Sequence, residues 1–150
     1  MPRIVRIAEV GWEGSTARGA GVATATSSGA FTLPVTLASR IADPEGKTSP
    51  EELLAAAHAS CFAMSLGSEL AGAGTPPGRL DVRCTITMDE VEGRGHQIIH
   101  SAIDASGRVP GCDAAAFAQA AEAADAGCPF SALIKASATV SVNATLEEDG

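Results

Sequence analysis

Apolar positions follow two different periods along the chain, and their order predicts a mixed α+β fold. Near the N-terminus, short apolar runs separated by glycine- and serine-containing turns predict a three-stranded meander over Ile4–Val10, Gly21–Thr26 and Phe31–Leu37. Apolar and polar residues alternate over Asp81–Asp89, which predicts a half-buried strand, and Gln97–Ser106 is its expected partner. The same alternation predicts a last strand through Val140–Leu146, with its apolar residues facing inward.

A long helix is predicted in the middle of the chain. Ser49 can cap it, Pro50 suits its first position, and Glu52 completes a capping box. The helix should end near Gly72. Its interior is rich in Ala and Leu and has hardly any charge, so we expect it to be buried on nearly all sides.

Two further helices are predicted between the second and third groups of strands. Asp113 should cap a helix over Ala114–Ala126, which Gly127 ends, and a short helix should follow over Pro129–Lys135. The expected order of elements is therefore βββ-α-ββ-αα-β. A chain of 150 residues with 45% hydrophobic residues suits one globular domain over residues 1–150.

Charge and composition disfavour several kinds of partner. The formal net charge is −8, whereas nucleic-acid binding needs concentrated Lys and Arg, so no nucleic-acid partner is expected. The N-terminus lacks the basic segment and apolar core of an export signal, and no charge-free stretch approaches a membrane-spanning length. We therefore expect a cytoplasmic protein without a membrane partner.

Four cysteines are the main candidates for chemistry: Cys61, Cys84, Cys112 and Cys128. No two of them form a CxxC pair, so their spacing does not support a structural zinc site. Without an export signal, structural disulfides are not expected either. The thiols are therefore either inert and buried or used in redox chemistry.

Cys61 lies about three turns into the long apolar helix. Burial there should raise its pKa, and the helix dipole is too far away to compensate, so a reactive thiolate needs a cation from elsewhere. A small, inert core cysteine is the alternative reading. His58 precedes Cys61 by one helical turn and is a candidate base or hydrogen-bond partner, unless it only packs.

Cys128 has a different setting, because Gly127 ends one helix and Pro129 suits the first position of the next. The free amides of a helix N-terminus stabilise a thiolate, so Cys128 is a candidate reactive thiol, and the alternative is a capping cysteine without redox function. Cys84 should be inert on the apolar face of its strand, and Cys112 should be exposed in a turn.

The segments around these two cysteines resemble the paired cysteine motifs of the OsmC/Ohr family. The first segment is Thr48–Met64, which contains Cys61, and the second is Ala126–Ser131, which contains Cys128. Weaker, glycine-containing similarities extend the resemblance over nearly the whole chain, at Gly11–Gly14, Arg18–Gly21 and Val109–Gly111.

The resemblance implies a fold and an activity. Members of the family form intertwined homodimers, in which antiparallel sheets from both subunits wrap two central helices and the active sites lie at the interface. It implies a thiol peroxidase for organic hydroperoxides and hydrogen peroxide: Cys61 is oxidised to a sulfenic acid, Cys128 forms a disulfide with it, and an external dithiol reduces the disulfide. No metal, flavin or haem is implied.

The resemblance also implies a cation beside Cys61. An Arg and a Glu pair near the peroxidatic cysteine in this family, and Glu51 matches the Glu position. Arg40 matches the Arg of the OsmC branch, whereas Arg18 would correspond to that of the Ohr branch. We prefer Arg40, because the N-terminal hairpin resembles the OsmC branch. A redox sensor and a non-catalytic, stress-associated binding protein are the alternative functions.

Overall fold

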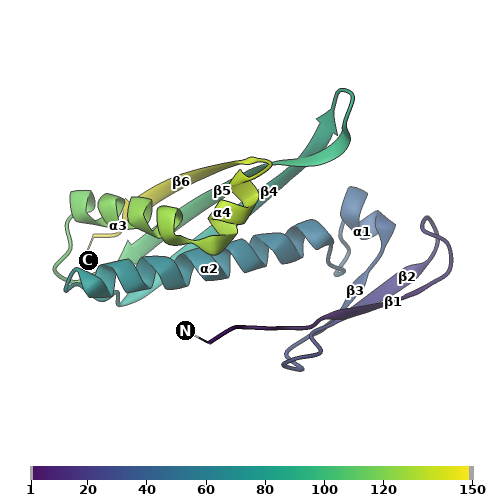
Figure 1. The fold of residues 1–150 in the computed structure, drawn as a ribbon, viewed down its shortest axis with the longest axis horizontal. Coiled ribbons are helices and arrows are strands. Elements are labelled where there is room, and N and C mark those ends of the chain that lie inside the picture. Colours follow the sequence, from purple (N-terminus) through teal and green to yellow (C-terminus); the bar gives the residue numbers. More distant parts are fainter. Residues whose placement is uncertain (1, 149–150) are drawn as a thin grey trace. The chain divides into compact units, whose positions relative to one another are not determined.

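The computed structural model describes residues 2–148, which fall into two compact units that divide between Leu53 and Leu54 (Figure 1). We call them the N-terminal unit and the C-terminal unit. The division lies within helix α2 (Pro50–Gly72), so the first turn of that helix belongs to the N-terminal unit and the rest belongs to the C-terminal unit.

A three-stranded antiparallel sheet forms most of the N-terminal unit. Its strands lie in the order β1 (Glu9–Glu13), β2 (Ala20–Thr24) and β3 (Thr32–Val35), which confirms the predicted meander. The first strand nevertheless begins later than the predicted Ile4–Val10. Glu9 pairs with Thr24, the last residue of β2, so the residues before Glu9 have no partner on that strand.

A short helix that the sequence pattern did not predict follows the sheet. Helix α1 (Leu37–Ile41) replaces the end of the expected strand Phe31–Leu37. Its N-terminus is a capping box, in which Thr36 Oγ1 accepts from the Ser39 amide and Ser39 Oγ accepts from the Thr36 amide, both at 3.0 Å. This local motif outweighs the apolar strand pattern and places Arg40 on a helix.

The C-terminal unit contains a sheet with the order β4–β5–β6. Its strands are β4 (Arg79–Val91), β5 (Gly95–Arg108) and β6 (Thr139–Leu146). The predicted antiparallel hairpin is confirmed, but the expectation of antiparallel sheets is wrong for β6, which pairs with β5 in parallel. Two helices lie between these strands and return the chain along the sheet, so that β6 starts beside His100 and runs in the same direction as β5.

These two helices begin as predicted, and the first of them ends one residue later than predicted, at Gly127. Helix α3 (Ala114–Gly127) is capped by Asp113, whose side chain accepts from the Ala116 amide at 2.8 Å. Helix α4 (Pro129–Lys135) starts directly after Cys128. Within this unit α3 and α4 lie along one face of the sheet, beside α2 (Figure 1).

The core of the C-terminal unit forms where these helices meet the sheet. Its buried residues are Phe62, Leu66 and Leu70 of α2, Ile103 and Ala105 of β5, Val109, and Phe117, Ala121 and Ala124 of α3. The strand β5 carries Gly107 where a Cβ would come within 2.9 Å of the Leu80 and Phe117 side chains. A glycine is therefore required for α3 to approach the sheet this closely.

Helix α2 is buried on one face only, contrary to the expectation that it is buried on nearly all sides. The buried face repeats every four residues, whereas Met64 on another face is 70% exposed. By length and composition alone α2 is also apolar enough to cross a membrane, which the sequence pattern did not indicate. One such helix is weak evidence of a span, because the core helices of soluble proteins pass the same test.

Candidate active site

Two free thiols meet in the C-terminal unit. The Sγ atom of Cys128, at the start of α4, donates to the Sγ atom of Cys61, in α2, over 3.2 Å. Cys128 is 1% exposed and Cys61 is half-buried. Since a disulfide brings two sulfurs to about 2.05 Å, the thiols lie little more than 1 Å from bonding distance.

The position of Cys128 follows from the way one helix ends and the next begins. Its backbone amide donates to the Asp125 carbonyl at 3.3 Å, and its carbonyl accepts from the Ala132 amide at 3.1 Å. Ser65 Oγ on α2 also donates to the Ala124 carbonyl at 3.0 Å, which fixes the end of α3 against α2. The prediction that Cys128 occupies the N-cap is confirmed, although its side chain makes no capping bond.

The surroundings of Cys61 in this unit favour the protonated thiol. Burial raises the pKa of Cys61 above its ordinary value, and the neighbouring Cys128 adds to the increase. The backbone amide of Phe130 acts in the opposite direction, because it stabilises the thiolate and lowers the pKa of Cys61. The upward shift predominates, as expected for a cysteine inside an apolar helix.

Arg40 and Glu51 form an ion pair within the N-terminal unit. Arg40 Nε and Nη2 lie 2.8 and 2.6 Å from the same carboxylate oxygen, Glu51 Oε1. The Glu51 side chain is 15% exposed, and its second oxygen is buried without a hydrogen-bond partner in the described part of the chain. The structure thus brings together the Arg and Glu that the resemblance selected.

Arg18, the alternative arginine, lies in the turn between β1 and β2. Its side chain is exposed and makes no ion pair with any residue in the range 2–148.

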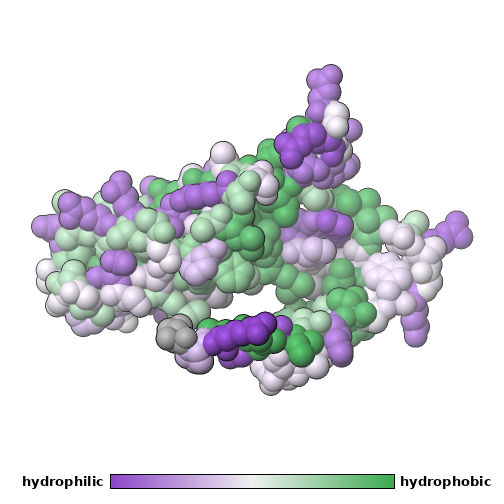
Figure 2. Space-filling view, viewed as in Figure 1, coloured by the Kyte–Doolittle hydropathy of each residue, from purple (hydrophilic) through white to green (hydrophobic). Residues whose placement is uncertain are grey.

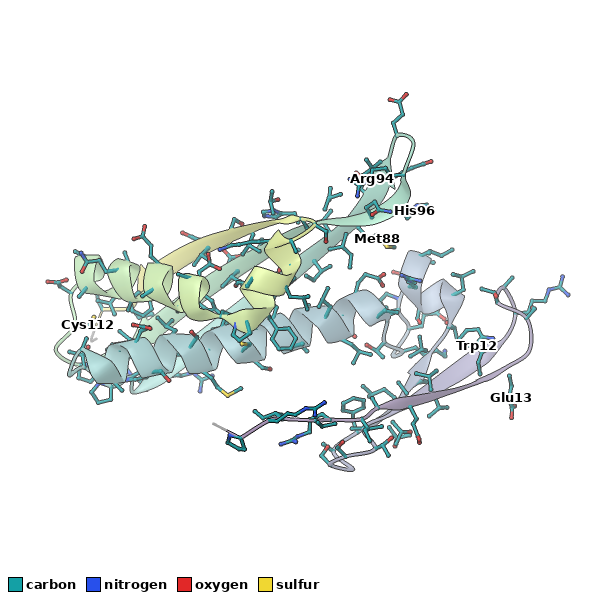
Figure 3. The ribbon with its side chains drawn as sticks, viewed as in Figure 1. Trp12, Glu13, Met88, Arg94, His96 and Cys112 are labelled. Atoms are coloured by element: carbon teal, nitrogen blue, oxygen red, sulfur yellow. The ribbon has the colours of Figure 1, made fainter. Side chains whose placement is uncertain are left out.

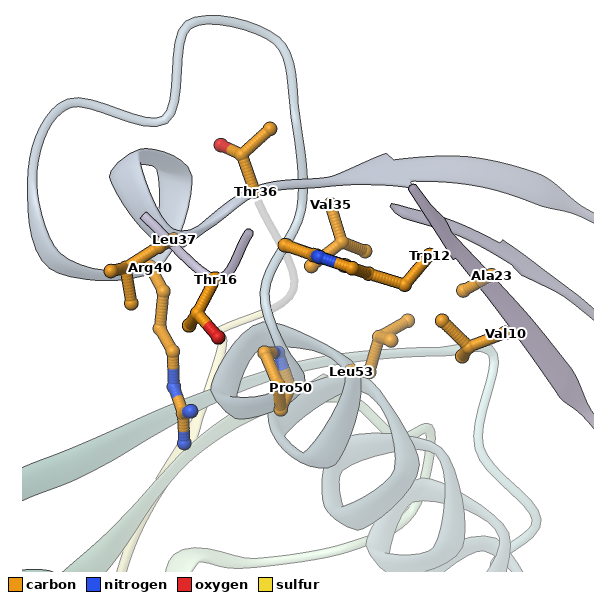
Figure 4. A pocket seen from close by; sticks show the side chains of 10 residues that line it. All are labelled: Val10, Trp12, Thr16, Ala23, Val35, Thr36, Leu37, Arg40, Pro50 and Leu53. Carbon is orange, nitrogen blue, oxygen red and sulfur yellow. The ribbon is translucent and has the colours of Figure 1, made fainter. Parts of the chain in front are cut away.

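A largely apolar pocket of about 490 Å³ lies beside Arg40 in the N-terminal unit (Figure 4). Its lining consists of Val10, Trp12, Thr16, Ala23, Val35, Thr36, Leu37, Arg40, Pro50 and Leu53. The Trp12 ring packs over its cross-strand partner Gly21, where a Cβ would come within 2.6 Å of the ring. Sequence reasoning missed this pocket, and the single Trp of the chain was the available signal for it.

His58 does not contact Cys61 as the sequence suggested. Its ring nitrogens bond to two serine hydroxyls, Nδ1 to Ser101 at 2.7 Å and Nε2 to Ser131 at 2.8 Å. Both nitrogens are therefore occupied, and the alternative of a packing role for His58 fits better. Neither serine had a sequence signal, because each stands alone in a strand or a short helix.

The other two cysteines lie outside the thiol pair. Cys84 is half-buried, its Sγ lies 3.1 Å from Ser101 Oγ, and burial raises its pKa, in keeping with an inert thiol. Cys112 lies in the turn before α3 (Figure 3). The turn sequence predicted that Cys112 is exposed, but it is partly buried against the core.

Solved structures with the same fold come from several bacteria. An organic hydroperoxide resistance protein OsmC from Legionella pneumophila superposes with a TM-score of 0.77 at 18% identity, covering 99% of this chain and 100% of that one. The organic hydroperoxide resistance protein OhrB of Bacillus subtilis gives a TM-score of 0.73 at 20% identity, covering 92% and 97% of the two chains. At these identities the likeness establishes the fold, and the predicted OsmC-like fold class is confirmed.

Sequence comparison identifies the family. The protein named Peroxiredoxin OsmC from Escherichia coli is 37% identical over 129 residues, which cover 86% of this chain and 89% of that protein. The relationship favours the OsmC branch, as the N-terminal hairpin suggested. The family model described as OsmC-like protein matches residues 43–143, a range that contains both Cys61 and Cys128. The chain therefore belongs to the OsmC-like protein family.

Proposed function

We propose that this protein is a thiol-dependent peroxidase that reduces hydroperoxides. The observation that carries the proposal is the 3.2 Å contact between the free thiols of Cys61 and Cys128. A relative at 37% identity is named a peroxiredoxin, and two structural neighbours are named organic hydroperoxide resistance proteins. These names and the thiol pair support the same chemistry.

In the proposed reaction, the Cys61 thiolate attacks one oxygen of the peroxide O–O bond. The bond breaks, an alcohol or water leaves after taking up a proton, and Cys61 becomes a sulfenic acid. The Cys128 thiol then attacks the oxidised sulfur, so that an S–S bond forms, the S–O bond breaks and water leaves. An external dithiol returns both cysteines to thiols and is itself oxidised to a disulfide.

Arg40 is proposed to supply the cation that Cys61 needs. Because burial raises the pKa of Cys61, little thiolate exists at neutral pH without a positive charge nearby. The guanidinium would stabilise the thiolate and polarise the peroxide, while Glu51 holds it in position through the contacts at 2.6 and 2.8 Å. Arg18 is the alternative, and its exposed side chain lacks such a partner among the described residues.

The substrate class we favour is organic hydroperoxides, with hydrogen peroxide as a smaller substrate. The pocket beside Arg40 has apolar walls, among them Trp12 and Leu53, that can accept an alkyl or aryl substituent. Transfer of the substituent from water to these walls would lower KM for bulky hydroperoxides. Reduction by a dithiol suits a reducing compartment such as the cytoplasm.

We also propose that the protein acts as a homodimer. Residues 53–68 of α2 contain no Asp, Glu, Lys or Arg, and one chain leaves Met64 of this segment 70% exposed. The short helix α4 adds Leu133, which is 66% exposed. Apolar residues thus lie at the molecular surface (Figure 2), and a second copy of the chain would remove them from water.

The test is steady-state turnover of reduced protein with cumene hydroperoxide or hydrogen peroxide, with dihydrolipoamide or thioredoxin as reductant. Sustained consumption of peroxide, faster with cumene hydroperoxide, is the expected result. Loss of a single equivalent per site without turnover would instead indicate a redox sensor. No consumption would indicate a non-catalytic binding protein and overturn the proposal.

A further inference from the structure

A buried histidine connects the long helix to two other elements of the C-terminal unit. His58 of α2 is fully buried, and so are its hydrogen-bond partners Ser101 of β5 and Ser131 of α4. Serine hydroxyls can both donate and accept, so a neutral imidazole satisfies both bonds in either tautomer. The imidazole is therefore a fixed cross-link between the sheet and α4.

This cross-link matters most for α4, because that helix has few other anchors. It contains seven residues, a length at which an isolated helix is unstable, and only Ser131 and Ile134 among them are buried. Leu133 is 66% exposed. The bond from Ser131 to His58 is consequently the main buried polar contact that holds α4 in place.

The position of α4 in turn sets the geometry of the two thiols. Cys128 is the N-cap of this helix, and the amide of Phe130 in its first turn interacts with the Cys61 sulfur. Ser131 lies three residues after Cys128, within the same first turn. A shift of α4 relative to α2 would therefore move the Cys128 sulfur away from Cys61.

We propose that His58 is a positioning residue for disulfide formation: through Ser131 it fixes the first turn of α4, and with it Cys128, against Cys61. The inference rests on the proposed peroxidase function. It assigns His58 to the second step, in which the Cys128 thiol attacks the sulfenic sulfur of Cys61 and water leaves. It assigns His58 no part in proton transfer at Cys61, since both ring nitrogens are occupied.

The charges around His58 are consistent with a neutral, structural imidazole. Burial lowers the pKa of His58, Asp125 of α3 raises it, and Lys135 of α4 lowers it again. Asp125 and Lys135 pair with each other at 2.6 Å, so their effects largely offset. On the side of β4, the neighbour is the Cys84 thiol, 3.7 Å from Nδ1.

The test measures how well disulfide formation competes with further oxidation. Reduced full-length protein is treated with a series of cumene hydroperoxide concentrations, alkylated, and analysed by intact mass. The concentration at which half of Cys61 is over-oxidised to the sulfinic acid reports the rate of disulfide formation relative to the second oxidation. A misplaced Cys128 lowers this concentration, because a second peroxide then reacts with the sulfenic acid before the Cys128 thiol does.

Two single-serine variants separate the α4 contact from the sheet contact. Ser131→Ala removes the bond to α4, and we expect the half-oxidation concentration to fall by up to about 10²-fold, the loss that a displacement of about 1 Å can cause. The rate of the first oxidation should fall much less. Ser101→Ala removes the bond from His58 to β5 and the 3.1 Å contact with Cys84, but it leaves the bond from His58 to α4. It serves as the matched control, with an unchanged half-oxidation concentration.

A second pair of variants replaces His58 itself. This pair tests the inference even if Ser131→Ala does not fold. The amide of His58→Gln can occupy the place of Nε2 and keep the bond to Ser131, whereas that of His58→Asn can occupy the place of Nδ1 and keep the bond to Ser101. We expect His58→Gln to behave like wild type and His58→Asn like Ser131→Ala.

A wild-type half-oxidation concentration in folded Ser131→Ala or His58→Asn would overturn the inference. An equal decrease of this concentration in Ser131→Ala and Ser101→Ala would overturn it as well. Failure of the proposed function is distinguishable, because wild-type protein would then form no disulfide under any peroxide concentration.

Discussion

The sulfur atoms of Cys61 and Cys128 lie 3.2 Å apart although 67 residues separate them in the chain. One cysteine belongs to the long helix α2, and the other is the residue between α3 and α4. Neither helix needs to unwind for the sulfurs to bond, because a displacement of about 1 Å brings them to disulfide distance. This short separation supports the proposed reversible oxidation of the pair.

Replacing Cys61 and replacing Cys128 should affect peroxide consumption in different ways. Cys61→Ser should abolish peroxide consumption, because a hydroxyl is a far poorer nucleophile at neutral pH. Cys128→Ser should consume about one equivalent per site and then stop at the sulfenic acid, or reach the sulfinic acid under excess peroxide. Intact mass should show wild type losing two hydrogens and Cys128→Ser gaining oxygen.

Normal turnover of Cys128→Ser with a dithiol would show that Cys128 is not needed for resolution. First-equivalent reactivity in Cys61→Ser would show that the attacking and resolving thiols have been assigned in the wrong order.

Replacing the two candidate arginines should reduce the rate of peroxide consumption to different extents. Arg40→Met should reduce the rate of peroxide consumption by at least about 10²-fold, because it removes the cation proposed for the Cys61 thiolate and the peroxide. Glu51→Gln should have an intermediate effect, because it weakens the contacts at 2.6 and 2.8 Å that orient Arg40. Initial rates with cumene hydroperoxide measure both.

Arg18→Met is the matched control and should be mild. A reversed order of severity would assign the catalytic arginine to the Ohr pattern and exclude Arg40. Circular dichroism checks that each variant keeps its fold.

His58 should make the stability of the protein depend on pH. Its pKa in the folded protein is lowered from the ordinary 6.5, mainly by burial. Between 6.5 and the lower folded value, the unfolded chain binds a proton that the folded chain does not, so stability is lost as the pH falls through this window. The loss is at most about 1.4 kcal/mol per pH unit for one proton.

Urea unfolding at a series of pH values tests this, with His58→Gln compared with wild type. The variant should lose the part of the slope that begins near pH 6.5. His96→Gln, at the exposed tip of the β4–β5 hairpin beside Arg94 (Figure 3), is the control and should keep it. Equal slopes in all three proteins would contradict the assignment of a buried, neutral His58.

The proposed homodimer can be tested by sedimentation velocity at micromolar concentration. We expect a dimer, and we expect Met64→Lys to weaken it, because the change places a charge on the charge-free face of α2. Glu122→Lys, on the exposed side of α3, should leave the dimer intact. A wild-type monomer at this concentration would contradict the prediction.

Local sequence determined most of the secondary structure in this protein. Ser49 and Pro50 marked the start of α2, and Asp113 and Gly127 marked the two ends of α3, because capping depends on residues within one turn. The Glu52 carboxylate accepts from Thr48 Oγ1 at 2.7 Å, which differs from the predicted capping box. The alternation in β4 and β6 predicted which residues face the core, since strand side chains have a period of two. The family followed from segments around Cys61 and Cys128 that could be read directly.

Only the tertiary structure decided how these elements meet. The direction of β6 depends on the path of α3 and α4, which no strand pattern records. The buried face of α2 depends on which side the sheet covers, so the uniformly apolar sequence of this helix did not predict that Met64 is exposed. His58 received its partners, Ser101 and Ser131, from strand and helix positions 43 and 73 residues away, and such long-range contacts leave no local pattern in the sequence.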